Sequence, residues 1–291
     1  MRHSLRSECQ ANRFIIKTIK GGYMFKGMVI VITGGSSGLG KALAQRFLKR
    51  GANLAIIARD TNKLSTLKAM LAVTCGGGQK IEIFPCDVSD YAATEKTMNN
   101  IVDTLGLPDI LINSAGILRE GYFENLSLTT FREIMDINYF GVLNCTKAML
   151  PFFKQKGRGR IVNISSLGGK MASFGYSAYC SSKFALVGLT ETLRMELKPQ
   201  GHLVCPGEFE SPMVDDLNTY RTAENRVVTH TVPVLPLDVV ADEIIKGIQK
   251  DRYLVIPGFM ARFLERLSRL FPSLSRSITD YKIRSVCGGT R

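Results

Sequence analysis

The stretch Met28-Val-Ile-Val-Ile-Thr33-Gly34-Gly-Ser-Ser-Gly38-Leu-Gly40 decides the fold of this chain. It begins with an apolar, β-branched run, which predicts a buried strand, and continues into a glycine-rich turn. Leu39, Leu43 and Phe47 then recur at helical spacing and predict a helix directly after the turn. A strand, a tight turn and a helix in this order are typical of a parallel sheet with crossover helices.

The turn itself favours phosphate binding. Glycines let the backbone come close to a pyrophosphate, and a helix N-terminus offers free N–H groups and a positive dipole end. The spacing is Thr33-Gly34-x-x-x-Gly38-x-Gly40, which differs from the more general G-x-G-x-x-G fingerprint. We therefore expect a dinucleotide cofactor at this turn, held by Gly34, Ser36, Ser37, Gly38, Leu39 and Gly40.

The alternation of strand and helix continues along the chain. It predicts one α/β domain over residues 24–258, a Rossmann-like doubly wound parallel sheet with helices on both faces. Right-handed crossovers bring the C-terminal ends of the strands to one crevice, where such folds bind ligands. The polar, irregular segment 208–236 is predicted to be a loop that covers the substrate. Expected strands are 28–33, 53–58, 81–84, 110–113, 161–164 and 253–256, and expected helices are 62–73, 91–105, 128–156 and 237–250.

A second stretch carries candidate chemistry. Ile161–Ile164 is a short apolar run that ends near Ser166, and a helical pattern starts at Ser177. Tyr179 and Lys183 are four residues apart, so they neighbour each other on one helix face. A nearby ammonium is expected to lower the pKa of a phenol from its usual value of about 10. Such a tyrosine can exchange a proton with a substrate oxygen that Ser166 holds by a hydrogen bond.

A tyrosine and a lysine at this spacing are common on surface helices, so the remaining residues matter. Ser166, Tyr179 and Lys183, with Asn138 upstream, resemble the catalytic tetrad of the short-chain dehydrogenase/reductase family. The resemblance implies an oxidoreductase in which Tyr179 is the general acid and Lys183 also binds the nicotinamide ribose. It assigns Asn138 to a water-mediated proton relay, although a buried asparagine that satisfies only backbone groups is the alternative. It also implies a homo-oligomer.

Further motifs follow the family order over about residues 26–258. By resemblance, Asp87 and Val88 contact the adenine, Asn113, Ala115 and Gly116 lie beneath the nicotinamide ribose, and Pro206 and Gly207 form a turn under the nicotinamide. One departure stands out, because only His202–Cys205 separates Gly201 from Pro206 where the family has a longer strand. The sequence therefore leaves open where the sixth strand and Pro206-Gly207 lie.

The end of the second predicted strand bears on cofactor choice. NAD-binding folds place a carboxylate there for the ribose 2′-hydroxyl, whereas this chain has Ala58 followed by Arg59. A guanidinium at this point favours a 2′-phosphate. We therefore expect NADP(H), with Ser36 and Ser37 as further donors. If Asp60 were the ribose ligand instead, NAD would be the cofactor.

The expected reaction is reduction of a ketone to a secondary alcohol. The segments Glu208–Met213 and Thr229–Val234 resemble proteins related to 3-ketodihydrosphingosine reductases, which favours a long-chain 3-keto lipid. The alternative to a long-chain 3-keto lipid is another carbonyl substrate, such as a steroid or a 3-oxoacyl thioester. The rival function is a catalytically silent NADP(H)-binding sensor or scaffold, which the short sixth strand favours and the intact Ser166, Tyr179 and Lys183 set disfavours.

Composition and residue spacing argue against several other classes of protein and of binding site. The 291 residues are 45% hydrophobic and carry a net charge of +13, most of which lies in residues 1–23 and 259–291. No nucleic-acid recognition motif occurs, so no nucleic-acid partner is expected. The seven cysteines include no C-x-x-C pair and the three histidines are scattered, which predicts reduced thiols, no metal site and a cytoplasmic protein.

The two ends are expected to lie outside the catalytic domain. Residues 1–23 lack apolar periodicity and resemble a transit peptide faintly; a disordered tail, or translation that starts at Met24, is favoured. Residues 259–291 are predicted to form a basic amphipathic helix and a tail. Its apolar stripe, with arginines between, suits either peripheral contact with an anionic membrane or packing against its own domain or a sister subunit. The stripe is Phe259, Phe263, Leu267, Leu270 and Phe271.

Overall fold

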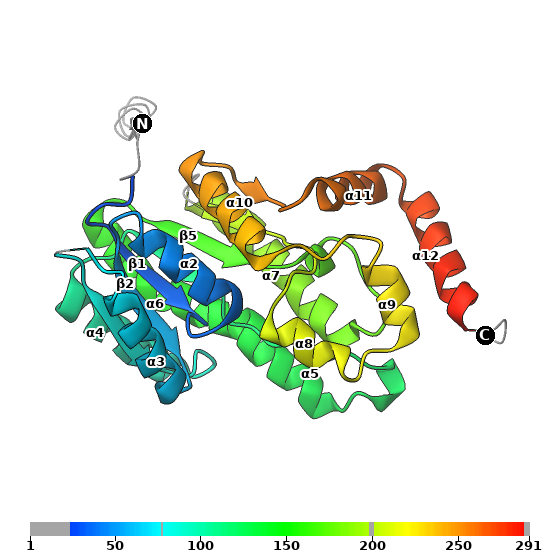
Figure 1. Ribbon diagram of the computed structural model, residues 1–291, viewed down its shortest axis with the longest axis horizontal. Helices are drawn as coiled ribbons and strands as arrows, with labels where there is room; N and C mark the ends of the chain where they lie inside the picture. Colours follow the sequence, from blue (N-terminus) through cyan, green and yellow to red (C-terminus); the bar gives the residue numbers. More distant parts are fainter. Residues whose placement is uncertain (1–23, 77, 198–200, 288–291) are drawn as a thin grey trace, which may run out of the picture.

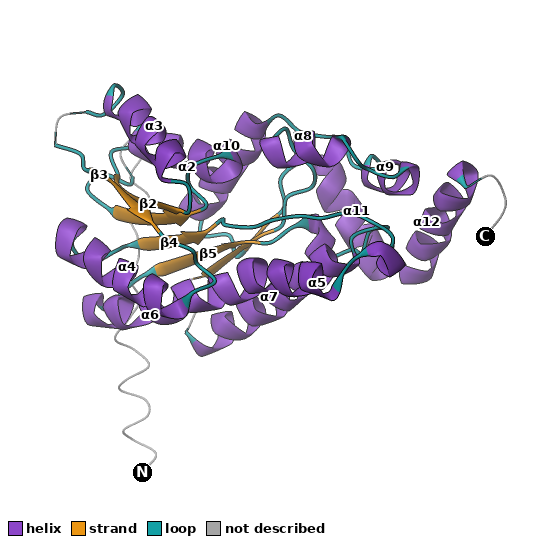
Figure 2. Ribbon diagram, turned by 90° about the horizontal axis from the view of Figure 1, so that it is seen from below, coloured by secondary structure: helices purple, strands orange, loops and turns teal. Residues whose placement is uncertain are grey.

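Seven parallel strands lie side by side in the order β3-β2-β1-β4-β5-β6-β7 within the part of the chain that the structure describes (Figures 1 and 2). This computed structural model describes residues 24–76, 78–197 and 201–287. The predicted N-terminal extension, residues 1–23, lies outside them. The strands are β1 (Val29–Thr33), β2 (Asn53–Ala58), β3 (Ile81–Pro85), β4 (Ile110–Asn113), β5 (Arg160–Ile164), β6 (Gly201–Val204) and β7 (Leu254–Val255).

Strand β1 is central, and all five of its residues are buried. Ile30 and Ile32 point into the apolar core on one face of the sheet, while Val31 points into the core on the other face. Successive side chains of a strand point to opposite faces, so a strand covered on both sides must be apolar throughout. The unbroken apolar run seen in the sequence follows from this position.

Helices cover both faces of the sheet, as expected for a doubly wound fold. Figure 2 shows α2, α3 and α10 on one face and α4, α6 and α7 on the other. The crossover helices are α2 (Gly38–Leu48), α3 (Thr61–Ala72), α4 (Tyr91–Leu105), α5 (Leu128–Met135), α6 (Gly141–Lys156), α7 (Ser177–Glu196) and α10 (Leu237–Gln249). The predicted fold class is therefore confirmed.

Two segments differ from their sequence-based expectation. The helix expected over 128–156 is interrupted by a π-helical turn, Asp136–Phe140, which places Asn138 at its centre. The loop expected over 208–236 contains two short helices, α8 (Pro212–Asn218) and α9 (Ala223–Thr229). Each is seven residues long, too short to show a clear apolar period.

The sixth strand, which the sequence left open, forms within the sheet. Strand β6 pairs in parallel with β5, from Ile161 opposite Gly201 to Ile164 opposite Val204. The Leu167 amide donates to Pro206 O at 2.7 Å, which places Pro206-Gly207 beside the end of β5. The connection from α7 to β6 runs through residues 198–200, which lie outside the described part.

The C-terminal segment forms two helices where one helix and a tail were expected. Helix α11 (Phe259–Leu270) is followed directly by α12 (Pro272–Val286), because the proline at the start of α12 cannot continue the preceding helix. Figure 1 shows α11 leading away from the sheet to α12, which lies at the far end of the molecule next to α9. No helix in the described ranges has the length and apolar character needed to cross a bilayer.

Candidate active site

A cavity of about 470 Å³ opens along the C-terminal ends of the strands. It is lined by most of the residues expected at the site, and Asn113 and Asn138 are absent from its wall. The expected residues that line it are Gly34, Ser36, Ser37, Gly38, Leu39, Gly40, Arg59, Asp87, Val88, Ala115, Gly116, Ser166, Tyr179, Lys183, Pro206 and Gly207.

The N-terminus of α2 fits an anionic group. Its N-cap residue, Ser37, makes no side-chain hydrogen bond to the first turn, and that turn holds no acidic residue. In contrast, Asp60 and Asp90 cap α3 and α4 with carboxylates. A Cβ on Gly38 would meet nothing within 4 Å, so this turn faces open space in the cavity. Free N–H groups without a carboxylate are the arrangement that binds a pyrophosphate.

The carboxylate of Asp60 is already engaged by Lys63 at the start of α3. It accepts a hydrogen bond from Lys63 N at 2.9 Å and lies 3.6 Å from the Lys63 ammonium. The Arg59 side chain is 60% exposed, and its ion pair with Asp87 is loose at 3.8 Å. Arg59 is therefore free to turn toward a ligand at this end of the cavity.

Asn113 serves the sheet and does not touch the cavity. Its side-chain amide donates to Asn163 Oδ1 at 2.9 Å, and Asn163 donates in turn to Thr190 Oγ1 at 2.9 Å. The loop after β4 is instead positioned by Thr33 Oγ1, which accepts hydrogen bonds from the Ser114 and Ala115 amides. Ser114, Ala115 and Gly116 of this loop line the cavity, and Asn113 does not.

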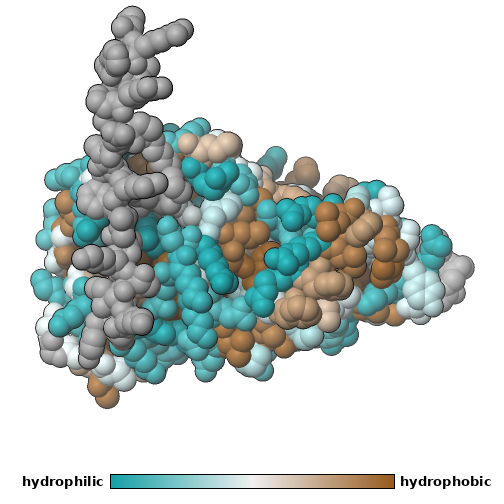
Figure 3. All heavy atoms as spheres, turned by 90° about the horizontal axis from the view of Figure 1, so that it is seen from above, coloured by the Kyte–Doolittle hydropathy of each residue, from teal (hydrophilic) through white to brown (hydrophobic). Residues whose placement is uncertain are grey.

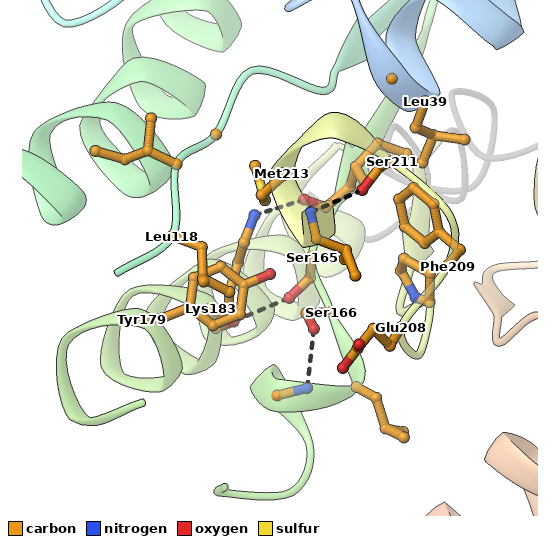
Figure 4. Close-up of a pocket in the computed structure, with 18 of the residues that line it drawn as sticks. Leu39, Leu118, Ser165, Ser166, Tyr179, Lys183, Glu208, Phe209, Ser211 and Met213 are labelled. Carbon is orange, nitrogen blue, oxygen red and sulfur yellow. Dashed lines mark hydrogen bonds between the residues drawn. The ribbon is translucent and has the colours of Figure 1, made fainter. Parts of the chain in front are cut away.

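Ser166, Tyr179 and Lys183 meet at one end of the cavity (Figure 4). Ser166 begins a short 3₁₀ turn, η3 (Leu167–Gly169), and its Oγ accepts the Gly168 amide at 3.0 Å. The Lys183 ammonium donates to Ile164 O at 3.1 Å and lies 5.7 Å from the centroid of the Tyr179 ring. Helix α7 thus presents the tyrosine and the lysine to the end of β5.

Burial controls the protonation of both groups. It raises the pKa of Tyr179 to about 12, against a smaller opposing effect of a hydrogen bond with Ser166. It lowers the pKa of Lys183 to about 8. The expectation that Lys183 lowers the pKa of Tyr179 is wrong for the protein alone, because desolvation is larger and the ammonium is turned to Ile164 O. At neutral pH the phenol keeps its proton, which is the form that a general acid needs.

Asn138 lies behind this end of the cavity and is fully buried. Its side chain accepts from Ile117 N at 2.8 Å and donates to Ile117 O at 2.9 Å and to Ser182 Oγ at 3.0 Å. A Cβ on Gly116 would lie 3.1 Å from Asn138 Oδ1 and 3.5 Å from Lys183 Nζ. Asn138 therefore holds the backbone next to Lys183 and also contacts the Ser182 side chain, and its role in a proton relay stays a prediction.

The outer wall of the cavity comes from segment 208–236, which was predicted to cover the substrate, and from the C-terminal helices, whose contribution the sequence did not reveal. Helices α8, α9, α11 and α12 all contribute to it. Leu267 of the predicted apolar stripe faces the cavity together with Leu264, one turn earlier on α11. The only signal for these residues was the amphipathic pattern, which does not tell what a helix packs against. The apolar residues of this wall are Met213, Val214, Leu217, Val228, Val232, Leu264, Leu267 and Ile278.

Comparison with known proteins agrees with this geometry. Residues 28–222 match the family of short chain dehydrogenases. The chain belongs to this family. A 3-ketodihydrosphingosine reductase of Bos taurus is 37% identical over 225 residues, covering 76% of this chain and 68% of that protein. One of Dictyostelium discoideum is 34% identical over 285 residues, covering 91% and 85%.

A solved structure agrees in fold. A short chain dehydrogenase/reductase of Burkholderia phymatum, in complex with NAD, superposes with a TM-score of 0.76 at 24% identity and covers 86% of this chain and 95% of that one. The short-chain dehydrogenase described here is thus an oxidoreductase that acts on carbonyl or alcohol groups with a nicotinamide dinucleotide. It is related to the 3-ketodihydrosphingosine reductases.

The low pKa of Lys183 predicts a stability effect of known sign. Its pKa in the folded protein, about 8, lies below the ordinary 10.5, so the fold bears the cost of a buried ammonium at pH 7. Without added nucleotide, Lys183→Met is expected to raise the free energy of unfolding at pH 7 by on the order of 2 kcal/mol. The stability gain of Lys183→Met should shrink as pH rises from about 8 to about 10. In this range Lys183 of the folded wild type releases its proton before the same lysine of the unfolded chain does, so the wild type becomes more stable.

Urea unfolding across this pH range measures the effect. Lys147→Met, at an exposed lysine of α6, is the matched control and should show no such trend. A difference between Lys183→Met and the wild type that stays constant with pH would contradict the argument.

Proposed function

We propose that this enzyme reduces a ketone to a secondary alcohol with NADPH, and that its substrate is a long-chain 3-keto lipid such as 3-ketodihydrosphingosine. The observation that carries the proposal is the position of Ser166 and of a protonated Tyr179 in one cavity with the uncapped N-terminus of α2. The relatives named 3-ketodihydrosphingosine reductase support the substrate class. A silent sensor would need no such acid, so the intact set of residues disfavours it.

The protein's own residues supply position and a proton. Bound NADPH supplies the hydride. Tyr179 donates its proton to the substrate oxygen, and Ser166 donates a hydrogen bond to the same oxygen. The Lys183 ammonium, 5.7 Å from the Tyr179 ring centroid, stabilises the phenolate that remains and binds the nicotinamide ribose. Lys183 therefore acts after the proton has left the tyrosine, when a negative charge is there to stabilise.

The cofactor is NADP(H) because the end of β2 lacks a ribose-binding carboxylate. Ala58 is the last residue of β2, and Asp60 caps α3 with its side chain. Arg59, Lys63, Ser36 and Ser37 line this end of the cavity. Two cationic side chains and two hydroxyls suit a 2′-phosphate, since a guanidinium binds phosphate through paired hydrogen bonds.

A lipid substrate suits the outer wall of the cavity. The wall presents apolar side chains from α8, α9, α11 and α12, and it continues from Tyr179 toward α12. Burial of each methylene of an alkyl chain against such a wall contributes about 0.8 kcal/mol. A long chain therefore contributes more to binding here than a short ketone can.

We also propose peripheral contact of α11 and α12 with an anionic membrane. Helix α11 buries only Ala261 and Glu265, and Phe259 and Phe263 are 74% and 50% exposed. Arg266 and Arg269 lie on the same helix, and Figure 3 shows hydrophobic and hydrophilic side chains interleaved on the face seen from above. Exposed aromatic residues beside arginines are typical of helices that lie on anionic lipid.

Removing the Tyr179 hydroxyl tests the chemistry. Tyr179→Phe is expected to lower kcat by at least about 10²-fold, because the proton donor is lost, while the Kd for NADPH changes by less than about twofold. Tyr176→Phe, at a second tyrosine on the cavity wall, is the matched control and should retain kcat within about tenfold. Loss of NADPH absorbance with 3-ketodihydrosphingosine measures the rate, and a fully active Tyr179→Phe would refute the assignment.

The cofactor assignment has its own test. Arg59→Ala is expected to raise the KM for NADPH by about tenfold while leaving the KM for NADH within about twofold, since only NADPH carries the 2′-phosphate. Asp60→Asn is the comparison at the next residue and should leave NADH use unchanged. A wild type that prefers NADH, and loses that preference in Asp60→Asn, would make Asp60 the ribose ligand.

Vesicle sedimentation tests the membrane contact. The protein is expected to sediment with vesicles of phosphatidylcholine and phosphatidylserine, less with pure phosphatidylcholine, and less again at high salt. The double variant Phe259→Asp, Phe263→Asp should abolish binding. Phe123→Asp, at a phenylalanine that is 71% exposed on another segment, should not. Equal binding of all three proteins would exclude α11 as the contact.

A further inference from the structure

The charged residues of the cavity wall are unevenly distributed. Arg59, Asp60, Lys63 and Asp87 lie just after β2 and β3, near the α2 turn to which the proposed function assigns the cofactor phosphates. On the substrate side, the described part of the chain contributes a single carboxylate, that of Glu208, and one lysine of α12, Lys282, whose ammonium donates to Thr231 Oγ1 at 2.8 Å. Glu208 follows directly on Pro206-Gly207 and has a side chain that is 10% exposed. No step of the reaction proposed above uses it.

Glu208 is held in place by a buried arginine. The guanidinium of Arg221 donates to Glu208 Oε1 at 2.8 Å and to Glu208 Oε2 at 2.5 Å. Arg221 is itself fixed by Asn225 Oδ1 at 2.7 Å and Thr229 Oγ1 at 2.9 Å, and its side chain has no exposed surface. Each carboxylate oxygen has two lone pairs, so Glu208 keeps acceptor capacity on its cavity side.

This carboxylate lies next to the catalytic residues. The hydrogen bond from Leu167 N to Pro206 O ties the Glu208 segment to the residue after Ser166. On the other side, the Tyr176 ring packs 5.5 Å from the Tyr179 ring, and Arg221 reaches the Tyr176 hydroxyl at 3.4 Å. Figure 4 shows the Glu208 side chain near Ser166. A group bound to Glu208 is therefore close to the carbonyl that Tyr179 protonates.

We propose that Glu208 binds a protonated amine on the carbon next to the reacting ketone. The inference rests on the proposed function and deepens it, because 3-ketodihydrosphingosine carries a primary amine on that carbon. With this ammonium bound, the substrate cation, the Glu208 carboxylate and the Arg221 guanidinium form a row of alternating charges. A hydrogen bond between charged groups in a site shielded from water is among the stronger polar contacts. Glu208 is thus a specificity residue that distinguishes an amino ketone from a plain ketone.

The other use of the same contacts is purely structural. Arg221 also donates to Asn218 Oδ1 at 3.1 Å, so the Glu208–Arg221 pair ties α8 and α9 to the loop after β6. If this were its whole role, a change at Glu208 would impair every ketone alike. A specificity role predicts that a change at Glu208 impairs an amino ketone more than a plain ketone, whereas a structural role predicts equal impairment. Comparing these two substrates therefore distinguishes the two roles.

The experiment compares 3-ketodihydrosphingosine with its analogue that lacks the amine. Glu208→Gln keeps the shape and removes the charge. Its kcat/KM for the amino ketone is expected to fall about tenfold or more, while kcat/KM for the analogue stays within about twofold. Inhibition by dihydrosphingosine, the amine-bearing product, should weaken by a similar factor. Glu208→Asp, which keeps the charge, should recover part of the loss.

Glu210→Gln, at an exposed glutamate two positions along, is the matched control and should behave as the wild type on both substrates. An equal loss on both substrates in Glu208→Gln, or no loss on either, overturns the role of Glu208 while the wild type still reduces the amino ketone. A wild type that reduces the analogue and not the amino ketone overturns the proposed substrate itself, and the role of Glu208 with it.

Discussion

The close approach of two backbone segments at the centre of the sheet is the constraint on which the site depends. Gly34, after β1, lies so near the loop after β4 that a Cβ on it would be 2.7 Å from Ala115 Cα. Strands β1 and β4 are neighbours in the sheet but not in sequence, because the strand order reverses between them. At this reversal the crossover helices leave to opposite faces, so a crevice opens between their loops. Only a glycine lets the crevice floor close this tightly while α2 begins above it.

At the other end of the crevice, desolvation acts on an acid and a base in opposite senses. Tyr179 and Lys183 are enclosed by β5 and the loop after β4, and burial disfavours the charged form of each. The phenol therefore keeps its proton while the ammonium binds its proton less tightly than in water. When the phenol loses its proton to a substrate, the same low dielectric strengthens the attraction between the phenolate and the ammonium. A site of this kind can donate a proton to a substrate oxygen and hold the phenolate that remains.

The substrate side is built on a different principle, with buried polar contacts holding short helices in place. Helix α9 begins at its cap residue Thr222, whose hydroxyl donates to Glu120 Oε1 at 2.7 Å, and Tyr122 donates to Glu224 at 2.7 Å. Arg221 ties the same region to Glu208. Helices of seven residues bury little apolar surface, so these directed contacts fix the wall where packing alone would leave it mobile. The placement of the Glu208 carboxylate on the cavity wall follows from this network.

The sequence by itself determined the family, the glycine-rich turn before α2 and most strands and crossover helices of the sheet, because apolar period, glycine spacing and the Tyr179–Lys183 interval are local patterns. It also named most of the residues that line the cavity beside α2, since these follow strand ends that meet at one edge. Tertiary structure alone decided that Asn113 turns into the sheet, that Asn138 holds a backbone segment, and that Lys183 does not lower the pKa of Tyr179 in the protein alone. Each depends on which partners surround a side chain, and on how much water is excluded there. The pairing of Glu208 with Arg221 joins the loop after β6 to the segment between α8 and α9, and no local sequence pattern predicts this contact.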